Sequence, residues 1–354
     1  MKRLSLESSQ SKRRGLIDKS VKSLHIIQDL KGSSIIKVDG VSISPTCLNC
    51  VDTPCKEFKT SEILPNVLNG MPANPSTKVC PVNAIFEDKS TGFPVIDPET
   101  CFGCGLCFNR CPYGAISLEV GRKAKILHGD SEIVKFAEVD SLAELSTTYE
   151  LRVSQNRIVT ENIPKDGLTT IYKEILRIRT LNQSFENLFT RNVLLCLGIN
   201  AKIKNIGNND IRIDLIGKQG ENIIAASIDL VGSDTLNIPR YLLDAIAVLH
   251  SRHNIDRKSI IPMVIVGSYP NKRSDFFEML GDIKDVTGFE TKTFSLHFLI
   301  IMMLLNKALN FDEIKGIFTL SKDKKDIKEE AKVIIPELEK LDYWFESSYY
   351  GSIK

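Results

Sequence analysis

Eight of the nine cysteines in this chain fall into two runs whose spacing suits metal chemistry. The first run, which is completed far downstream, consists of Cys47, Cys50, Cys55 and Cys80. The second run, at spacings of two, two and three residues, consists of Cys101, Cys104, Cys107 and Cys111. Four thiolates in such a run can hold the corners of a four-iron, four-sulfur cubane. The sequence therefore predicts two [4Fe–4S] clusters with these eight cysteines as ligands.

Zinc is the alternative metal for clustered cysteines. Zinc usually takes four cysteines as two separated Cys-x2-Cys pairs, and three in succession, as at Cys101, Cys104 and Cys107, fit it poorly. Gly103 and Gly105 lie inside this loop, where glycine can adopt positive φ and let backbone N–H groups approach the sulfurs. Iron–sulfur chemistry is therefore favoured. Two clusters favour electron transfer, because a purely structural role would need only one cluster.

Length and composition indicate an ordinary globular protein of two domains, with 354 residues, 42% hydrophobic and 25% charged. With 46 Lys and Arg against 44 Asp and Glu, net charge gives no argument for binding nucleic acid.

The amino terminus has no apolar signal-peptide core, and Phe298 to Leu305 is too short to span a bilayer. We therefore expect a cytoplasmic protein without membrane insertion, in which clustered cysteines bind metal. Cys196, outside both runs, is expected to be a buried core thiol.

The cysteine region resembles the two-[4Fe–4S] bacterial-type ferredoxin family. The residues that carry the resemblance are Cys80-Pro81-Val82-Asn83-Ala84-Ile85, Ile96-Asp97, and Cys101 through Cys111-Pro112-Tyr113-Gly114-Ala115-Ile116. The resemblance implies an α+β ferredoxin-like module in which the fourth cysteine of each run binds the other cluster. One cluster would then use Cys47, Cys50, Cys55 and Cys111, and the other Cys101, Cys104, Cys107 and Cys80. The chain departs from the family in two places. Four residues separate Cys50 from Cys55 instead of two, and the stretch from Cys55 to Cys80 is long.

The expected organisation has four parts. Residues 1–32 are predicted to be a basic N-terminal arm, 33–128 the dicluster module, 129–166 a connector and 167–354 an α/β domain. A hairpin is expected over Ile35 to Ile43, with Asp39-Gly40 as its turn.

The second half alternates between helical and strand periodicity. Helices are predicted at 168–197, 240–251, 274–286 and 295–309, and strands at 201–206, 211–216, 223–230, 260–266 and 291–294. The order α-β-β-β-α-β-α-β-α indicates an α/β domain with a mixed sheet.

This order resembles the restriction-endonuclease-like PD-(D/E)-x-K nuclease fold over about residues 168–305. The resemblance implies a divalent metal held by acids on the second and third strands, which here would be Asp214 and Asp229. Glu174 on the preceding helix is a third candidate acid. Val231 stands where the family has its lysine, so the catalytic set is incomplete. The acids are equally compatible with an ordinary α/β domain.

Two hypotheses for function follow. The first is an electron-transfer protein whose clusters exchange electrons with a redox partner protein. The second is a nucleic-acid-binding (DNA-binding) protein with a nuclease-like domain, in which the clusters are structural or redox-sensing. His250 and His253, and the loop Asn271-Lys272-Arg273, are weaker candidates for ligand contacts, and whether the chain is an enzyme is left open.

Overall fold

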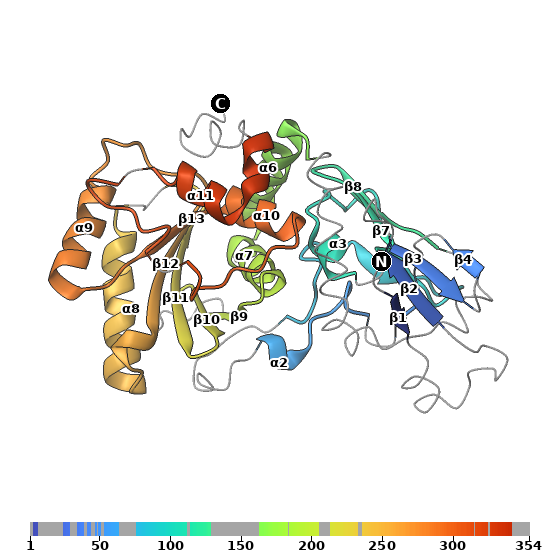
Figure 1. The fold of residues 1–354 in the computed structure, drawn as a ribbon, viewed down its shortest axis with the longest axis horizontal. Coiled ribbons are helices and arrows are strands. Elements are labelled where there is room, and N and C mark those ends of the chain that lie inside the picture. The colour runs from blue at the N-terminus through green and yellow to red at the C-terminus, as the bar shows by residue number, and fades with distance from the viewer. Residues whose placement is uncertain are drawn as a thin grey trace. The chain divides into compact units, whose positions relative to one another are not determined.

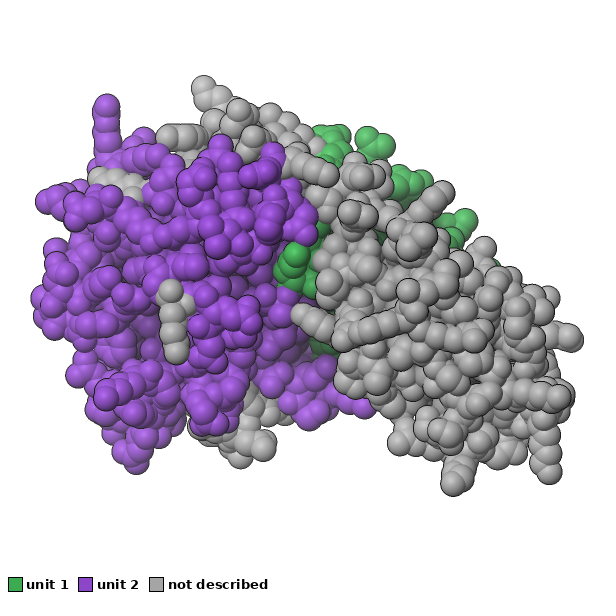
Figure 2. Space-filling view, viewed as in Figure 1, with its two compact units in different colours: residues 1–58, 78–171, 303–307 green, residues 59–77, 172–302, 308–354 purple. Residues whose placement is uncertain are grey.

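The computed structural model describes two compact units, which are coloured separately in Figure 2. Unit 1 comprises residues 1–58, 78–171 and 303–307, and unit 2 comprises 59–77, 172–302 and 308–354. Within them, the described residues are 3–5, 24–28, 34–38, 41–43, 47, 49–50, 53–63, 76–111, 114–128, 163–182, 184–204, 213–232, 236–314, 316–324 and 326–341. The predicted connector lies outside them except for its last residues, from Ile163 onward.

Unit 1 begins with a four-stranded antiparallel sheet in the order β1-β2-β3-β4 (Figure 1). Its strands are β1 (Arg3–Ser5), β2 (Leu24–Gln28), β3 (Ser34–Val38) and β4 (Val41–Ile43). The predicted hairpin is confirmed by β3 and β4, which pair from Val38↔Val41 to Ile36↔Ile43. The turn residues Asp39 and Gly40 lie outside the described part. Residues 1–32 were expected to form a basic N-terminal arm. Because β1 and β2 lie within them, part of this segment is β-sheet.

Two short hairpins and one helix carry the cysteine region. Strands β5 (Ile85–Glu87) and β6 (Pro94–Ile96) form one antiparallel pair, and β7 (Ile116–Glu119) and β8 (Lys123–Ile126) form the other. Helix α3 (Leu106–Arg110) lies between the pairs in sequence. Side chains from both hairpins join the cysteines in one buried cluster.

The long stretch between Cys55 and Cys80 leaves unit 1 and returns to it. Glu57 and Lys78 form an antiparallel bridge at its base, and the Val79 N–H donates to the Lys56 carbonyl at 2.9 Å. Residues 59–77 between them belong to unit 2, where α2 (Thr60–Ile63) packs against β9 (Asn200–Ile203). The middle of the predicted loop, residues 64–75, lies outside the described residues.

Unit 2 is built on a five-stranded mixed sheet in the order β13-β12-β11-β10-β9. The remaining strands are β10 (Leu215–Gln219), β11 (Asn222–Asp229), β12 (Ile260–Val266) and β13 (Lys292–Ser295). β9, β10 and β11 are antiparallel, whereas β11, β12 and β13 are parallel. Strand β12 tolerates Pro262 because β13 pairs with it only from Met263 onward.

The helices of unit 2 largely follow the predicted periodicity. They are α6 (Lys165–Leu181, whose first residues belong to unit 1), α7 (Phe185–Cys196), α8 (Ile238–His253), α9 (Phe276–Thr287), α10 (Leu296–Leu304) and α11 (Lys328–Ile334), with 3-10 turns η2 (Arg257–Ser259) and η3 (Pro336–Leu341). Every residue of α10 is buried, which explains its almost wholly apolar sequence. No described helix combines the length and apolarity needed to cross a membrane.

Two predicted helices and one predicted strand were wrong in detail. The helix expected over 295–309 is α10, which ends at Leu304. The long helix expected over 168–197 is two helices, because the Asn182 side chain accepts hydrogen bonds from the Ser184 N–H and hydroxyl at 3.2 and 2.8 Å. Such local side-chain hydrogen bonds compete with the backbone hydrogen bonds of an α-helix. The strand expected over 211–216 is β10, which begins only at Leu215, and residues 211–212 lie outside the described part.

Candidate metal centre

Three cysteines of the first run and one of the second run line one small cavity in unit 1. They are Cys47, Cys50, Cys55 and Cys111, and the rest of the lining is mostly apolar. The backbone places the two outermost cysteines. The Cys47 N–H donates to the Leu127 carbonyl at 2.7 Å, just after β8. Cys111 ends α3, where its N–H donates to the Cys107 carbonyl at 3.1 Å.

The other four cysteines form a second neighbourhood around Cys107. Burial, together with the nearby thiols of Cys104, Cys55, Cys80 and Cys101, raises the pKa of Cys107 well above its ordinary value. Burial also raises the pKa of Cys80, with Cys101 adding to the shift. Cys55 therefore acts on Cys107 although it lines the first cavity, so the two cysteine groups adjoin each other.

The described residues of the two Cys-Pro segments make matching contacts. The Ala84 N–H donates to the Cys80 sulfur at 3.2 Å, and the Ala115 N–H donates to the Cys111 sulfur at 3.3 Å. The residue before each alanine has a left-handed backbone, with φ of 57° at Asn83 and 67° at Gly114. Glycine and asparagine are the residues that adopt this conformation most easily. Each segment therefore aims a backbone donor at its cysteine sulfur.

The two cysteine loops also correspond to each other. Asn49 and Gly103, each one residue before the second cysteine of its run, have φ of 46° and 63°. Thr53 and Gly105, each two residues before the third cysteine, have φ of 36° and 88°. The positive φ expected at both glycines is confirmed. The extra residues between Cys50 and Cys55 can thus be placed at 51–52, outside the described part.

The hairpins hold the loops through matching contacts. The Asp97 N–H donates to the Ala84 carbonyl, and the Leu127 N–H donates to the Ala115 carbonyl, both at 2.8 Å. From the second hairpin, the Ala124 N–H reaches the Cys101 sulfur at 3.3 Å. Hydrogen bonds to cluster sulfurs are one way in which a protein tunes a reduction potential.

Residues 303–307 of unit 1 cover the second cysteine loop, a contact that sequence reasoning missed. The Asn109 side-chain amide donates to the Met303 carbonyl at 2.8 Å and to the Asn306 side-chain oxygen at 2.7 Å. A Cβ atom on Gly105 would lie 2.5 Å from the end of the Leu304 side chain, so a larger residue here would displace Leu304 in addition to straining the positive φ of 88°. The one signal that could have pointed to this contact was the glycine itself.

The surroundings of these thiols disfavour their charged form. Burial raises the pKa of Cys47 to about 11 and raises that of Cys55 further, with the Cys111 charge adding to both shifts. Thiolates are the metal-binding form, and bound cations would offset this cost. Among the described residues, no three His, Cys, Asp or Glu side chains converge closely enough for a single ion. An iron–sulfur cluster binds each thiolate at a separate iron, and the Cys-x2-Cys-x2-Cys spacing of the second run suits it better than zinc.

Comparison with known proteins supports the same cofactor. Residues 72–121, which include Cys80 and the whole second run, match the LdpA Fe-S cluster-binding domain. An uncharacterized ferredoxin of Methanocaldococcus jannaschii is 33% identical over 97 residues, which is 27% of this chain and 48% of the ferredoxin. The chain carries a ferredoxin-type iron–sulfur module.

Two further relatives of this ferredoxin-type module are, by name, the iron–sulfur subunit of a reductase and an electron transport protein. The iron–sulfur subunit ArrB of the arsenate respiratory reductase of Shewanella sp. strain ANA-3 is 35% identical over 85 residues, which is 24% of this chain and 36% of ArrB. The electron transport protein HydN of Escherichia coli is 33% identical over 86 residues, which is 24% of this chain and 36% of HydN. The chain thus spans less than half the length of these relatives, and the matches support iron–sulfur electron transfer.

Among the described residues, Asp214, Asp229 and Glu174 belong to no group of three His, Cys, Asp or Glu side chains that could hold a metal ion. Asp214 lies before β10, and its carboxylate accepts from the Ile228 N–H at 3.0 Å and pairs with Lys204 at 3.0 Å. Asp229, at the end of β11, accepts from two backbone N–H groups of the turn that follows. Glu174 pairs with Arg177 at 2.8 Å on the surface of α6. These contacts explain the acids as structural, and the comparisons give the nuclease-like resemblance no support.

The weaker candidates are also accounted for by local contacts. His250 places Nδ1 2.9 Å from the Ile255 carbonyl, and His253 is exposed at the end of α8. In the 271–273 loop, Lys272 pairs with Asp326 at 3.0 Å. Cys196 was expected to be a buried core thiol, but it is the last residue of α7 and is only half-buried.

Proposed function

We propose that this chain is an electron-transfer protein that holds two [4Fe–4S] clusters and exchanges electrons with a redox partner protein. One cluster is held by Cys47, Cys50, Cys55 and Cys111, and the other by Cys101, Cys104, Cys107 and Cys80. A bound [4Fe–4S] cluster supplies one-electron transfer at a potential set by its surroundings. The protein's own residues supply the thiolates, the N–H donors and the apolar walls.

The observation that carries this proposal is the duplicated Cys-Pro segment. Two independent stretches, 80–85 and 111–116, bring an alanine N–H to within 3.3 Å of a cysteine sulfur. A cluster that only stabilises the fold needs neither a second Cys-Pro segment nor backbone N–H groups that point at a cysteine sulfur. Both features suit two neighbouring redox centres whose potentials the backbone adjusts.

Chemical analysis and redox titration test the proposal. Anaerobically purified protein should contain iron and sulfide in equal amounts, sufficient for two cubanes. Its visible absorption should bleach reversibly on reduction and give the electron-spin signal of reduced clusters. A Cys196→Ala variant should retain all of this, because Cys196 lies outside both sets. Iron for only one cluster would overturn the stoichiometry, and clusters that cannot be reduced would overturn electron transfer.

A further inference from the structure

A second candidate site lies in unit 2, in a cavity of about 580 Å³ at the amino ends of two parallel strands. β12 begins at Ile260 and β13 begins at Lys292, and both residues line the cavity. Its other walls come from η2, from the end of α9 and from residues 311–316. This volume lies within the range of small-molecule sites, roughly 300–1,000 Å³.

Arg257 is held in place on one wall of this cavity. Its guanidinium carbon lies 5.2 Å from the centre of the Phe289 ring, and its Nη2 donates to the Thr287 carbonyl at 3.2 Å. These contacts fix the plane of the guanidinium while using only one of its N–H donors among the described residues. A guanidinium fixed in this way can bind a carboxylate through two parallel hydrogen bonds.

Lys258 adds a second positive charge beside Arg257. Its ammonium is exposed and has no ion-pair or hydrogen-bond partner within the described ranges. The neighbouring Asp256 carboxylate accepts from the Lys258 backbone N–H at 3.1 Å and so caps η2. The η2 wall therefore presents two cations, one of them fixed in orientation.

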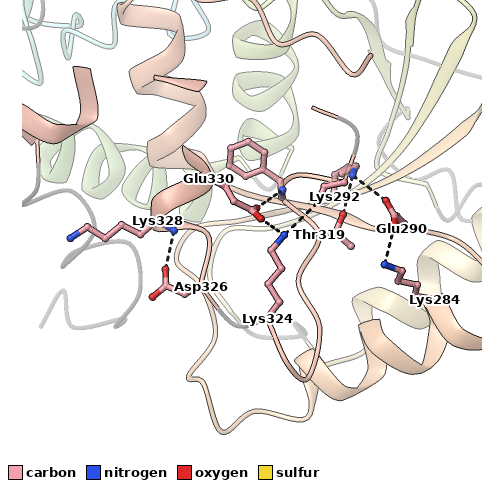
Figure 3. A network of polar contacts seen from close by, with 10 residues as sticks. Lys284, Glu290, Lys292, Thr319, Lys324, Asp326, Lys328 and Glu330 are labelled. Atoms are coloured by element: carbon pink, nitrogen blue, oxygen red, sulfur yellow. Dashed lines mark hydrogen bonds and ion pairs between the residues drawn. The ribbon is translucent and has the colours of Figure 1, made fainter. Parts of the chain in front are cut away.

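The cavity lining also carries a carboxylate, that of Glu290, which is already paired with lysines. Figure 3 shows Glu290 between Lys284 and Lys292, whose ammonium groups lie 3.0 and 3.6 Å from its oxygens. Lys292 also donates to the Thr319 hydroxyl at 2.9 Å. With two lysines beside it, Glu290 offers little repulsion to an anion that enters the cavity.

Apolar side chains supply much of the remaining surface, which also includes Asn222, His250 and Asp312. Phe289 and Phe311 line the cavity together with Ile260 and Pro262. We propose that this cavity binds an aromatic carboxylate, whose carboxylate pairs with Arg257 and Lys258 and whose ring packs against Phe289 and Phe311. This site is separate from the cysteine groups and does not depend on the proposed electron transfer.

Titration of the full-length holoprotein with 2-naphthoate, followed by calorimetry, tests the proposal. The matched neutral probe is 2-naphthalenemethanol, which has the same ring system without the charge. We expect 2-naphthoate to bind one site, with an affinity that falls as salt rises. Arg257→Gln should weaken binding roughly tenfold or more, because charge-assisted hydrogen bonds are lost. Lys258→Gln should weaken it less, because Lys258 contributes charge without a fixed geometry.

The control variant is Arg240→Gln, which removes an exposed cation of α8 that does not line the cavity. It should bind 2-naphthoate as the unmodified protein does. Arg257 is exposed, so its replacement should leave the fold intact, and circular dichroism checks this. The proposal is overturned if 2-naphthoate does not bind at millimolar concentration, if the neutral probe binds equally well, or if folded Arg257→Gln keeps full affinity.

Discussion

Asn83 and Gly114 adopt the same left-handed backbone conformation, each three residues after a cysteine that precedes a proline. In both places this conformation turns the next N–H, that of Ala84 or Ala115, toward the cysteine sulfur. The same combination of a left-handed residue and an N–H donor to sulfur therefore occurs in both cysteine neighbourhoods.

Replacing Gly114 with alanine should destabilise the metal-loaded protein by about 1–2 kcal/mol, the cost of a left-handed conformation for a residue with a Cβ. Asn83→Ala should cost a similar amount or less, and Asn83→Gly should be tolerated. Thermal unfolding of reconstituted protein measures these differences. A Gly114→Ala variant that is as stable as the parent would contradict a requirement for the left-handed backbone at this position.

Paired cysteine variants test which ligands share a cluster. Cys111→Ala should halve the iron content. Adding Cys50→Ala to it should remove no further cluster, because both residues are assigned to the same one. Adding Cys104→Ala to Cys111→Ala should instead remove nearly all iron. Iron quantitation after anaerobic reconstitution distinguishes these outcomes, and the reverse pattern would show that the fourth ligands are not crossed.

Arg191→Met should destabilise unit 2 by about 1–3 kcal/mol, because it leaves buried acceptors without a donor. Arg191 is fully buried, and its Nη2 donates to the Ser76 carbonyl at 2.8 Å and to the Asn192 side chain at 2.7 Å. Hydrogen exchange should also quicken around Ser76. The control is Arg177→Met on the exposed surface of α6, which should change stability by no more than about 0.5 kcal/mol. Equal effects of the two variants would argue against a role for the buried contact.

Unit 2 should lose stability as the pH falls from about 6.5 to about 4. Burial lowers the pKa of His297 to about 4, although its Nδ1 lies 3.2 Å from the Gly267 carbonyl. The unfolded chain therefore takes up a proton at a pH where the folded protein does not. Neutral His297 contributes its full stabilisation above pH 6.5, the pKa of an unfolded histidine. About 3 kcal/mol of the free energy of unfolding is lost once the pH falls below the pKa values of both the unfolded and the folded state. His297→Phe should flatten this part of a denaturation–pH profile, and an unchanged slope would assign the acid sensitivity to other groups.

The helices and strands of unit 2 were predictable because burial follows periodicity. The apolar run over 260–266 is β12, and the periodic segment over 240–251 lies within α8. Periodicity did not reveal the break between α6 and α7, because a short side-chain hydrogen bond at Asn182 decides it. Nor could it locate the cavity beside Arg257, whose walls come from segments that are far apart in the chain.

The iron–sulfur chemistry could be predicted from cysteine spacing alone, because spacing limits which metal centre a loop can surround. The positive φ at Gly103 and Gly105 was predictable too, since it is a local requirement. Which cysteines face one cavity depends instead on the fold, because hairpin and helix contacts, rather than proximity in the chain, bring Cys47 and Cys111 together. The same holds for Asp214 and Asp229, which the sequence offered only as weak candidates and whose carboxylates accept hydrogen bonds from backbone N–H groups that periodicity could not identify. A side chain's chemistry is fixed by its type, but its partners depend on how distant segments pack.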